Sequence, residues 1–224
     1  MEGDCDGFVP LMYDELTPEE MTKNASEFLY SMERRRTTRH FCDKPVSRDL
    51  IELAIQTAST APSGAHLQPW TFVAISNNDM KQRIREAAES EERKFYEERI
   101  PEEWNEVLEP LGTDFVKTHI TDAPWVVVLF RQTQRIRSNS EVSPTYYSME
   151  SCGIAAGIFI TAIHNMGLVT LTHTPSPMRF LEQLLERPEH ERAMLLLPVG
   201  YPAEDAMVPN LQRKALEEVA VFIE

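Results

Sequence analysis

The sequence predicts an α+β fold in a single domain of 224 residues. Three observations lead to this prediction. Hydrophobic residues make up 42% and charged residues 26%, which is ordinary for a chain that buries one full core. Helical and strand patterns are mixed along the chain, with only partial βαβ order. No Gly-x-Gly-x-x-Gly motif follows a predicted strand, so the sequence lacks the fingerprint of a dinucleotide-binding doubly wound sheet.

Capping signals and apolar periodicity predict the helices. Thr17 is a good N-cap, with Pro18 at the first helical position and Glu20 placed to complete a capping box. Ser47 caps a second helix that has one apolar face. A helix that begins at Ser143-Pro144 should end at Gly167. The predicted helices cover residues 17–36, 47–60, 79–99, 114–119 and 143–167.

Apolar, β-branched runs predict the strands. The clearest run is Trp125–Phe130, which we expect to be buried. Val219–Ile223 has the pattern of a last strand near the end of the sequence given. The predicted strands cover residues 70–75, 125–130, 168–173, 194–199 and 219–223.

The segment Cys152–Ile163 is apolar nearly all round, which predicts a helix buried on both faces. Gly153 and Gly157, four residues apart, would let another backbone approach closely. One small domain rarely covers a helix on every side, so the pattern suggests a dimer interface. A central helix in the core of a monomer explains it equally well, and periodicity does not separate the two.

The charge balance excludes several classes of function. The formal net charge is −14, so the chain should bind nucleic acid poorly, because each phosphate contact needs a lysine or an arginine. No apolar run reaches the ~18 residues of a membrane span, and the acidic N-terminus lacks a signal-peptide core. We therefore expect a soluble domain without a membrane segment, unless an anchor preceding Met1 has been removed.

Cysteine and histidine usage adds two expectations. Cys5, Cys42 and Cys152 are widely spaced and fit neither a zinc motif nor a disulfide framework. They favour a reducing compartment such as the cytoplasm. The six histidines form no ligand pair, so we assign no metal site.

Two motifs could carry chemistry. Residues 34–39 read Arg-Arg-Arg-Thr-Thr-Arg, and the planar fork of arginine suits a phosphate. The alternative is a set of cations at a helix C-terminus, which the helix dipole favours. Pro62-Ser63-Gly64-Ala65-His66 predicts a turn whose backbone could approach a flat ligand. Taken alone, the first motif fits helix-end cations better, and the second fits an ordinary loop.

Taken together, the motifs resemble the nitroreductase superfamily of FMN proteins. The resemblance spans about Phe8 to Ile223. Within the superfamily it is greatest for the iodotyrosine deiodinases, because Thr60–His66 is very similar to their turn and His66 stands where other nitroreductases usually have Asn. The motifs are Arg34-Arg35-Arg36-Thr37-Thr38-Arg39, Lys44-Pro45-Val46, Ala61-Pro62-Ser63-Gly64, Gln68-Pro69-Trp70, Leu197-Pro198-Val199-Gly200-Tyr201-Pro202 and Arg213-Lys214-Ala215-Leu216.

The resemblance implies a nitroreductase-like fold, with a central mixed sheet flanked by helices, in an intertwined homodimer. Residues 1–224 would form one FMN domain, with a lid segment at about 79–120 and a C-terminal extension at about 203–224. The chain departs from the family at His173, where another Thr is usual, so there we expect the backbone to contact the flavin. The implied cofactor contacts are Arg35, Arg36, Thr37, Thr38, Arg39, Pro62, Ser63, Gly64, Thr172, His173, Thr174 and Arg213.

The same resemblance implies the chemistry. Thr174 would be catalytic, because its hydroxyl would donate to flavin N5 and favour one-electron steps. Glu92 and Lys117 would hold the ammonium and carboxylate of an amino acid, with the Tyr96 hydroxyl beside them, and the Ala65 N–H would meet a phenolate oxygen. Without the family, the dense charge run around Glu92 fits a solvated helix face better.

The implied reaction is the reductive dehalogenation of 3-iodo-L-tyrosine and 3,5-diiodo-L-tyrosine, with NADPH as reductant either directly or through a reductase. Two alternatives stay open on the sequence. One is a general NAD(P)H-dependent nitroreductase or quinone reductase. The other is a protein that binds flavin or halotyrosine without turnover.

Overall fold

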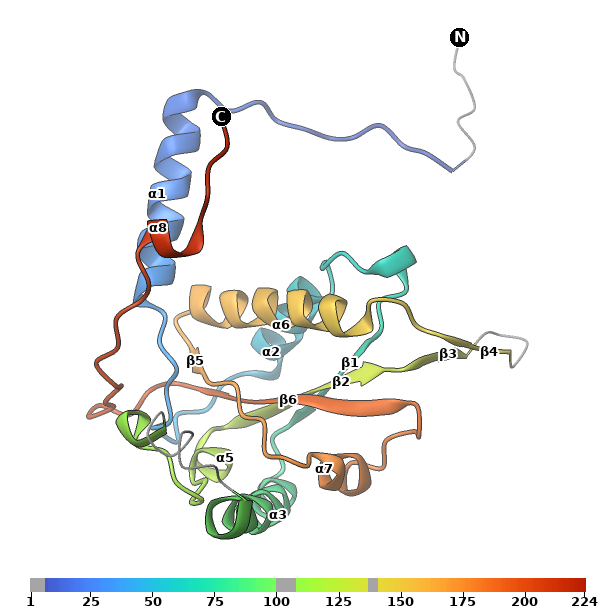
Figure 1. Cartoon of the computed structure of the whole chain (residues 1–224), viewed down its shortest axis with the longest axis vertical. Helices are drawn as coiled ribbons and strands as arrows, with labels where there is room; N and C mark the ends of the chain where they lie inside the picture. The colour runs from blue at the N-terminus through green and yellow to red at the C-terminus, as the bar shows by residue number, and fades with distance from the viewer. Residues whose placement is uncertain (1–6, 100–107, 137–140) are drawn as a thin grey trace. The chain divides into compact units, whose positions relative to one another are not determined.

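The computed structural model describes residues 7–99, 108–136 and 141–224 (Figure 1). The chain divides into two units, residues 1–35 and 36–224. The first unit holds α1 (Pro18–Arg34), and the predicted capping box is confirmed. Thr17 Oγ1 accepts a hydrogen bond from the Glu20 N–H at 3.2 Å, and the Glu20 carboxylate accepts one from the Thr17 N–H at 2.9 Å. No residue of α1 is buried, and apolar side chains such as Phe28 and Leu29 are more than half exposed.

The second unit is built on a four-stranded sheet. Its strands are β1 (Trp70–Ile75), β2 (Trp125–Gln132), β6 (Glu191–Gly200) and β5 (Val169–Thr170), in the order β1-β2-β6-β5. Each neighbouring pair is antiparallel. A parallel bridge between Thr37 and Thr170 adds the arginine motif to the edge and makes the sheet mixed, as predicted.

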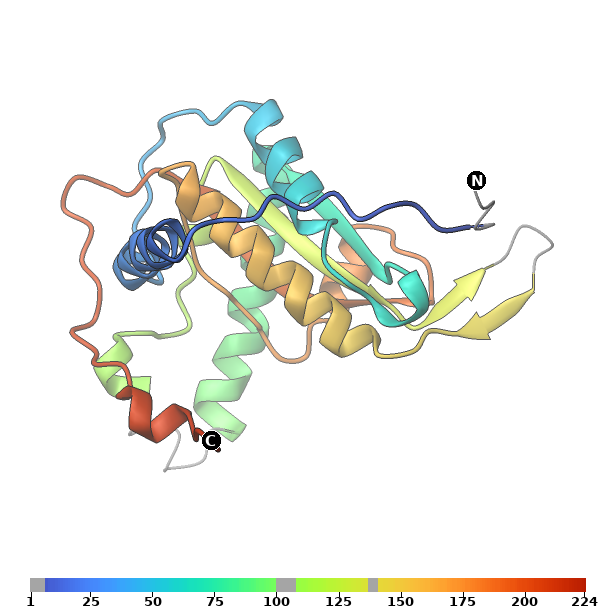
Figure 2. The same ribbon diagram turned by 90° about the horizontal axis from the view of Figure 1, so that it is seen from above.

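Helices cover both faces of this sheet, as Figures 1 and 2 show. Helices α2 (Arg48–Ala58) and α6 (Ser148–Asn165) pack on one face, against Val127 and Leu197. Helices α3 (Asn78–Lys94), α5 (His119–Asp122) and α7 (Arg179–Leu184) cover the other, against Val126, Val128 and Leu196. Because successive residues of β2 point to opposite faces and both faces are covered, the strand is apolar throughout. The α+β prediction is therefore confirmed.

Within the described part of residues 36–224, the apolar helix α6 is covered on one side. Cys152, Ala155 and Phe159 are fully buried against the sheet. Ile154 is 45% exposed, and a Cβ placed on Gly157 would meet no atom within 4 Å. Within the described part of residues 36–224, the core therefore does not enclose α6 on every side.

Residues 141–147 correct the predicted start of that helix. Ser143 and Pro144 lie in β4 (Val142–Pro144), which pairs with β3 (Gln134–Ile136) in a hairpin that projects from the sheet in Figure 2. Proline suits this short edge strand because it has no N–H to pair. Helix α6 begins only at Ser148, after Tyr147 takes a left-handed conformation with φ of 51°.

The predicted strand at 219–223 is also wrong. Val219, the first residue of the predicted strand, is the last residue of helix α8 (Leu216–Val219). The Glu218 carboxylate of this helix accepts a hydrogen bond from the Ala215 N–H at 2.8 Å. Phe222 is 73% exposed and Ile223 95% exposed. A strand needs a neighbouring edge to bond to, and the described part of this chain offers none here.

Other boundaries shifted for local reasons. The helix predicted at 114–119 is α5 at His119–Asp122, because the Asp114 carboxylate accepts from the Val116 N–H at 2.8 Å and makes a turn instead. Within the strand predicted at 168–173, the structure has only the short β5 and an isolated bridge from His173 to Leu196. No helix was predicted where α7 lies. Short helical turns complete the chain: η1 (Gly64–His66), η2 (Phe95–Arg99) and η3 (Glu109–Leu111).

Candidate functional site

The arginine motif crosses the edge of the sheet beside β5. The Thr38 N–H donates to the Thr170 carbonyl at 3.3 Å, and Thr38 is 3% exposed. Arg36 donates through Nη2 to the carbonyl of Pro209, in the C-terminal segment. The motif thus joins two parts of the second unit that lie far apart in sequence. Arg35 belongs to the first unit.

A cavity of about 310 Å³ opens beside this motif. Arg39 lines it and is half-buried, and burial lowers the pKa of its guanidinium, although it stays cationic at neutral pH. Among the described residues no carboxylate forms an ion pair with Arg39, so the cavity wall presents a cation that suits an anionic group such as a phosphate. The cavity is lined by Thr37, Arg39, His40, Pro110, Leu111, Gly112, Met207, Val208 and Pro209.

The turn predicted at 62–66 is a strained backbone feature. The Ser63 hydroxyl accepts from the Gln68 N–H at 2.9 Å, so it closes the turn. Ala65 and His66 have φ values of 50° and 54°, which cost free energy in residues other than glycine and are typical of functional loops. A Cβ on Gly64 would lie 2.9 Å from the Tyr146 carbonyl oxygen, so only glycine fits there. No acceptor for the Ala65 N–H occurs in the described part of the chain.

The segment 171–175 alternates between exposed and buried side chains. Thr172 and Thr174 are exposed, while His173 is 7% exposed. The His173 N–H donates to the Leu196 carbonyl and the Leu196 N–H to the His173 carbonyl, both at 2.9 Å. A backbone contact from His173 to a flavin, as the sequence predicts, would therefore need the second lone pair of its carbonyl oxygen, because its N–H is already used.

The His173 ring points into a buried polar group formed with the lid residues. We call Glu92, Tyr96, Lys117, His119 and His173 the Glu92 cluster. Glu92 pairs with Lys117 (Oε2 to Nζ, 3.4 Å) and with His173 (Oε1 to Nε2, 3.2 Å). The Lys117 side chain is 5% exposed and that of Glu92 13% exposed. The solvated charge run that the sequence also allowed is therefore wrong for Glu92.

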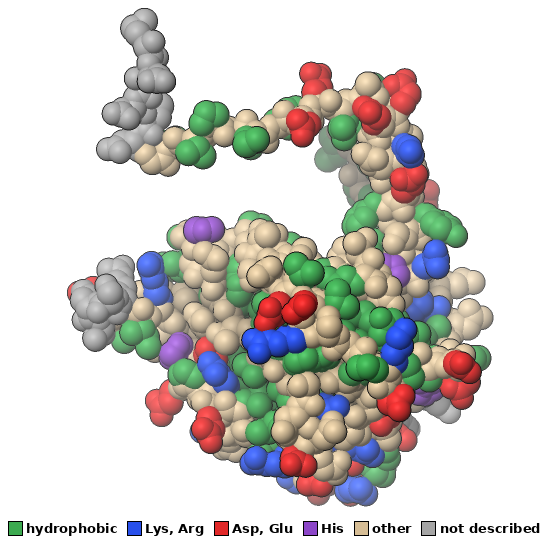
Figure 3. All heavy atoms as spheres, turned by 180° about the vertical axis from the view of Figure 1, so that it is seen from behind, with side chains coloured by type: hydrophobic (Ala, Val, Ile, Leu, Met, Phe, Trp, Pro, Cys, Tyr) green, Lys and Arg blue, Asp and Glu red, His purple; other side chains and the backbone are tan. Residues whose placement is uncertain are grey.

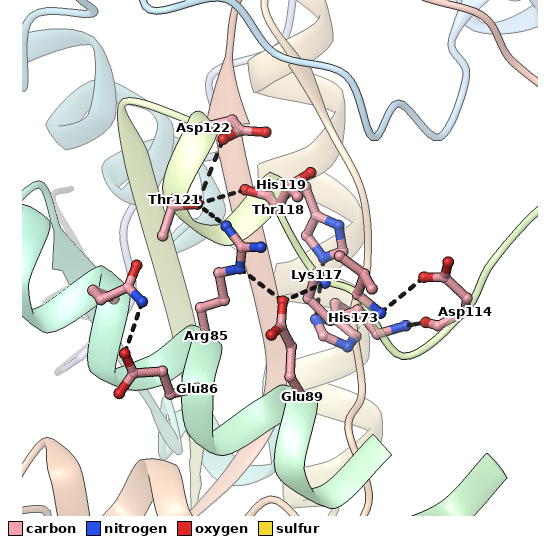
Figure 4. A network of polar contacts seen from close by, with 12 residues as sticks. Arg85, Glu86, Glu89, Asp114, Lys117, Thr118, His119, Thr121, Asp122 and His173 are labelled. Carbon is pink, nitrogen blue, oxygen red and sulfur yellow. Dashed lines mark hydrogen bonds and ion pairs between the residues drawn. The ribbon is translucent and has the colours of Figure 1, made fainter. Parts of the chain in front are cut away.

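Contacts from several elements hold the cluster, and Figure 4 shows those around Lys117, His119 and His173. The Tyr96 hydroxyl donates to the Thr113 carbonyl at 3.3 Å. The Glu89 carboxylate accepts from the Lys117 N–H at 2.8 Å and from Arg85 Nε at 2.7 Å, which fixes the chain at Lys117. Lys117 Nζ also donates to the carbonyl of Asp114.

Burial and charge set opposing effects on the pKa values. Burial alone would raise the pKa of Glu92, but the hydrogen bond with His173 and the Lys117 charge lower it below its usual value. Burial lowers the pKa of Lys117, against the pull of Glu92. Burial lowers the pKa of His173, although Glu92 opposes this, and burial beside the His173 ring lowers the pKa of His119 to about 2. At neutral pH the cluster therefore holds the carboxylate of Glu92 beside the ammonium of Lys117, and both imidazoles are neutral.

Arg39 connects the two parts of the site. It lines both the 310 Å³ cavity and a second cavity of about 220 Å³, which His119 also lines. Its charge also bears on the pKa values of Lys117 and His119. Arg213 is exposed in the C-terminal segment, and the structure does not bring it to the cavity wall. Part of the predicted lid, residues 100–107, lies outside the described residues.

Sequence reasoning missed His119, which became visible only in the fold. Its one signal in the sequence is its position two residues after Lys117, in the segment that follows the charged helix α3. A larger cavity of about 900 Å³ also lies in the second unit, where arginines and glutamates line it together. On the face seen in Figure 3, basic side chains are scattered among acidic and apolar ones, so it has no basic patch for nucleic acid. Among the described helices, none is long and apolar enough to cross a membrane.

Comparisons with known proteins give the following. Residues 32–201 match the nitroreductase family. The iodotyrosine deiodinase of Haliscomenobacter hydrossis is 49% identical over 216 residues, which cover 96% of each chain. That of Nematostella vectensis is 44% identical, over 94% of this chain and 80% of the relative. Iodotyrosine deiodinase 1 of Homo sapiens is 38% identical, over 96% of this chain and 75% of the relative.

A solved structure is also similar. It is the crystal structure of an oxidized iodotyrosine deiodinase bound to FMN and 3-iodo-L-tyrosine. It superposes with a TM-score of 0.76 at 27% identity, and the match covers 87% of this chain and 100% of that one.

Proposed function

Because this chain belongs to the nitroreductase family, we propose that it is an FMN-dependent oxidoreductase that removes iodide from iodotyrosines. The observation that carries the proposal is the buried pair of Glu92 and Lys117, whose charges lie 3.4 Å apart. An amino acid zwitterion offers the opposite arrangement, an ammonium for the carboxylate and a carboxylate for the ammonium. Relatives named for this activity, together with an FMN- and iodotyrosine-bound structural neighbour, support the same substrate.

The cofactor assignment rests on the chemistry of the donors. FMN carries a phosphate and a flat ring, and Arg39 and Thr37 line a cavity where the guanidinium has no carboxylate partner among the described residues. The turn at Ser63-Gly64, which leads into the strained Ala65 and His66, and the exposed Thr172 and Thr174 side chains would lie along the ring. The proposed cofactor contacts are Arg35, Arg36, Thr37, Thr38, Arg39, Pro62, Ser63, Gly64, Thr172, His173, Thr174 and Arg213.

When bound and reduced, FMN supplies the two electrons that, with one proton, replace the carbon–iodine bond by a carbon–hydrogen bond and release iodide. The chain itself orients the substrate. Glu92 and Tyr96 hold its ammonium end, Lys117 holds its carboxylate, and the Ala65 N–H stabilises its phenolate oxygen. Thr174 donates its hydroxyl to the flavin edge. The lid segment would then exclude water from the iodinated ring of the substrate, which would lie against the flavin.

The test uses the purified protein with FMN under anaerobic conditions. After reduction by dithionite, 3,5-diiodo-L-tyrosine should yield monoiodotyrosine, tyrosine and iodide, measured by chromatography. The matched control is the same mixture without dithionite, which should release no iodide. A protein that binds iodotyrosine but releases no iodide would be a binding protein without turnover. Flavin bleaching by NADPH alone, with turnover of nitroarenes but no iodide, would identify a general nitroreductase instead.

We also propose that the protein works as a homodimer. Ile154 and Gly157 leave the outer face of α6 uncovered, and the apolar residues of α1 and of 221–223 are exposed as well. Such surfaces usually mark an interface, and the last residues could cross to the second subunit. Gly157→Leu should shift the protein from dimer to monomer in sedimentation analysis, while Glu86→Gln, a change on the exposed side of α3, should not. A wild-type monomer would contradict the proposal.

The natural reductant is proposed to be NADPH, either directly or through a reductase. Stopped-flow mixing of the anaerobic protein with NADPH distinguishes these routes. Slow flavin reduction by NADPH alone, accelerated by a cell extract that contains a reductase, favours the indirect route. Fast reduction without the extract favours the direct one.

A further inference from the structure

The two histidines of the Glu92 cluster form a chain of contacts that ends on the substrate-binding carboxylate. His173 Nε2 lies 3.2 Å from Glu92 Oε1, and His173 Nδ1 lies 3.4 Å from His119 Nε2. The two rings meet edge to face, with centroids 5.1 Å apart. His119 and His173 come from different elements, α5 and the segment after β5, so the fold alone brings them together.

Hydrogen-bond logic fixes the direction of this chain. An ionised Glu92 carboxylate can only accept, so His173 must donate from Nε2. A neutral His173 then has an acceptor at Nδ1, so His119 must donate from Nε2. The result is a one-way relay, from His119 to His173 to Glu92, in which each tautomer is set by its neighbour.

We propose that His173, oriented by His119, is a positioning residue that holds the Glu92 carboxylate for the α-ammonium of the substrate. Lys117 alone cannot do this, because in the proposed function it turns to the substrate carboxylate. Once Lys117 has turned, His173 is the contact that keeps Oε1 fixed and leaves Oε2 for the ammonium. The relay would thus select amino acids over simple halophenols. This inference rests on the proposed function.

The surrounding charges are consistent with this role. Lys117 and Arg39 face the histidines from the segments 108–118 and 36–47, and Glu92 and Arg85 face them from α3. Tyr96 lies beside Lys117, with its ring 5.8 Å from the ammonium. Burial disfavours the charged form of both imidazoles and lowers their pKa values, and the nearby cations act in the same direction. The hydrogen bond from His173 also helps to hold the pKa of Glu92 below its usual value.

Three variants test the relay, each loaded with FMN and checked by its visible spectrum. His173→Leu removes the donor, His173→Gln keeps a donor of similar reach, and His119→Phe keeps the ring but removes its N–H. The measured quantity is the Kd of 3-iodo-L-tyrosine, from quenching of flavin fluorescence across a pH range that begins at about 4, near the usual pKa of a glutamate. The matched ligand is 2-iodophenol, which has the halogenated ring but no ammonium or carboxylate.

His173→Leu should raise the Kd of iodotyrosine about tenfold or more and leave that of 2-iodophenol unchanged. In His173→Leu, the weakening of iodotyrosine binding at low pH should begin at a higher pH than in the wild type, because Glu92 without the hydrogen bond takes up a proton more readily. His173→Gln should restore most of the affinity, and His119→Phe should show a smaller loss with the same ligand selectivity. Equal losses for both ligands, or a weakening in His173→Leu that begins at the same low pH as in the wild type, would overturn the proposal. A wild-type protein that fails to bind iodotyrosine would contradict the proposed function instead.

Discussion

The two sides of the segment 171–175 differ sharply. On one side, the His173 ring enters the Glu92 cluster, where the buried polar atoms have partners within the chain. On the other side, Thr172 and Thr174 are exposed. The polar groups on the first side are already paired within the chain, whereas the two hydroxyls on the second side face solvent. Successive residues of an extended strand point to opposite faces, so one short segment can serve both substrate and cofactor.

From this difference we expect the two sides to affect different quantities, ligand binding on the first side and reaction rate on the second. A buried charge pair is costly to leave incomplete, so the Glu92 cluster should discriminate strongly between ligands that satisfy its charges and ligands that do not. An exposed hydroxyl gains less from one hydrogen bond, so Thr172 and Thr174 should tune the rate more than the binding. Three changes test this division, in order of decreasing effect.

Glu92→Gln should raise the Kd of 3-iodo-L-tyrosine about 30-fold or more, since removing one partner of a buried charge pair costs roughly 2 to 5 kcal/mol. FMN content should not change, because Glu92 lies on the other side of the segment from Thr172 and Thr174. Isothermal titration of the FMN-loaded protein measures this. Glu86→Gln is the matched control, because its exposed carboxylate on the same helix accepts only from Gln82 among the described residues. An equal affinity for both variants would sink the assignment of Glu92.

Arg39→Met should weaken FMN binding about 10- to 100-fold, because it removes charge-assisted hydrogen bonds worth about 1.5 to 3 kcal/mol. Fluorescence titration of the apoprotein with FMN gives the Kd. Arg83→Met, on the exposed side of α3, serves as control and should bind like wild type. If Arg39→Met lost iodotyrosine affinity but kept its FMN, Arg39 would belong to the Glu92 cluster alone.

Thr174→Ala should slow iodide release up to about tenfold, because it removes one neutral hydrogen bond worth about 0.5 to 1.5 kcal/mol. The Kd values of FMN and iodotyrosine should stay within about twofold of wild type on the same ground. Single-turnover measurement of iodide under anaerobic conditions separates rate from binding. Thr174→Ser retains the hydroxyl and should recover the rate, and a slow Thr174→Ser would argue against the hydroxyl.

Features that depend on neighbours in sequence could be predicted from the sequence. The capping box at Thr17, the buried run of β2 and the turn at Ser63-Gly64 all follow from local residue types. Each of these signals lies within a few residues, where propensity and spacing act directly. Glu92 and Lys117 were predicted as a pair only through the family resemblance, and the fold places their charged groups 3.4 Å apart.

Only the tertiary structure decided which distant residues meet. It brought His119 and His173 together, set Arg39 between two cavities and turned residues 142–144 into a hairpin strand. It also left residues 221–223 without a partner strand in the described chain, although their β-branched and aromatic side chains favour one. A strand or a buried polar cluster is stabilised by contacts between segments, and the free energy of those contacts is absent from any local window of sequence.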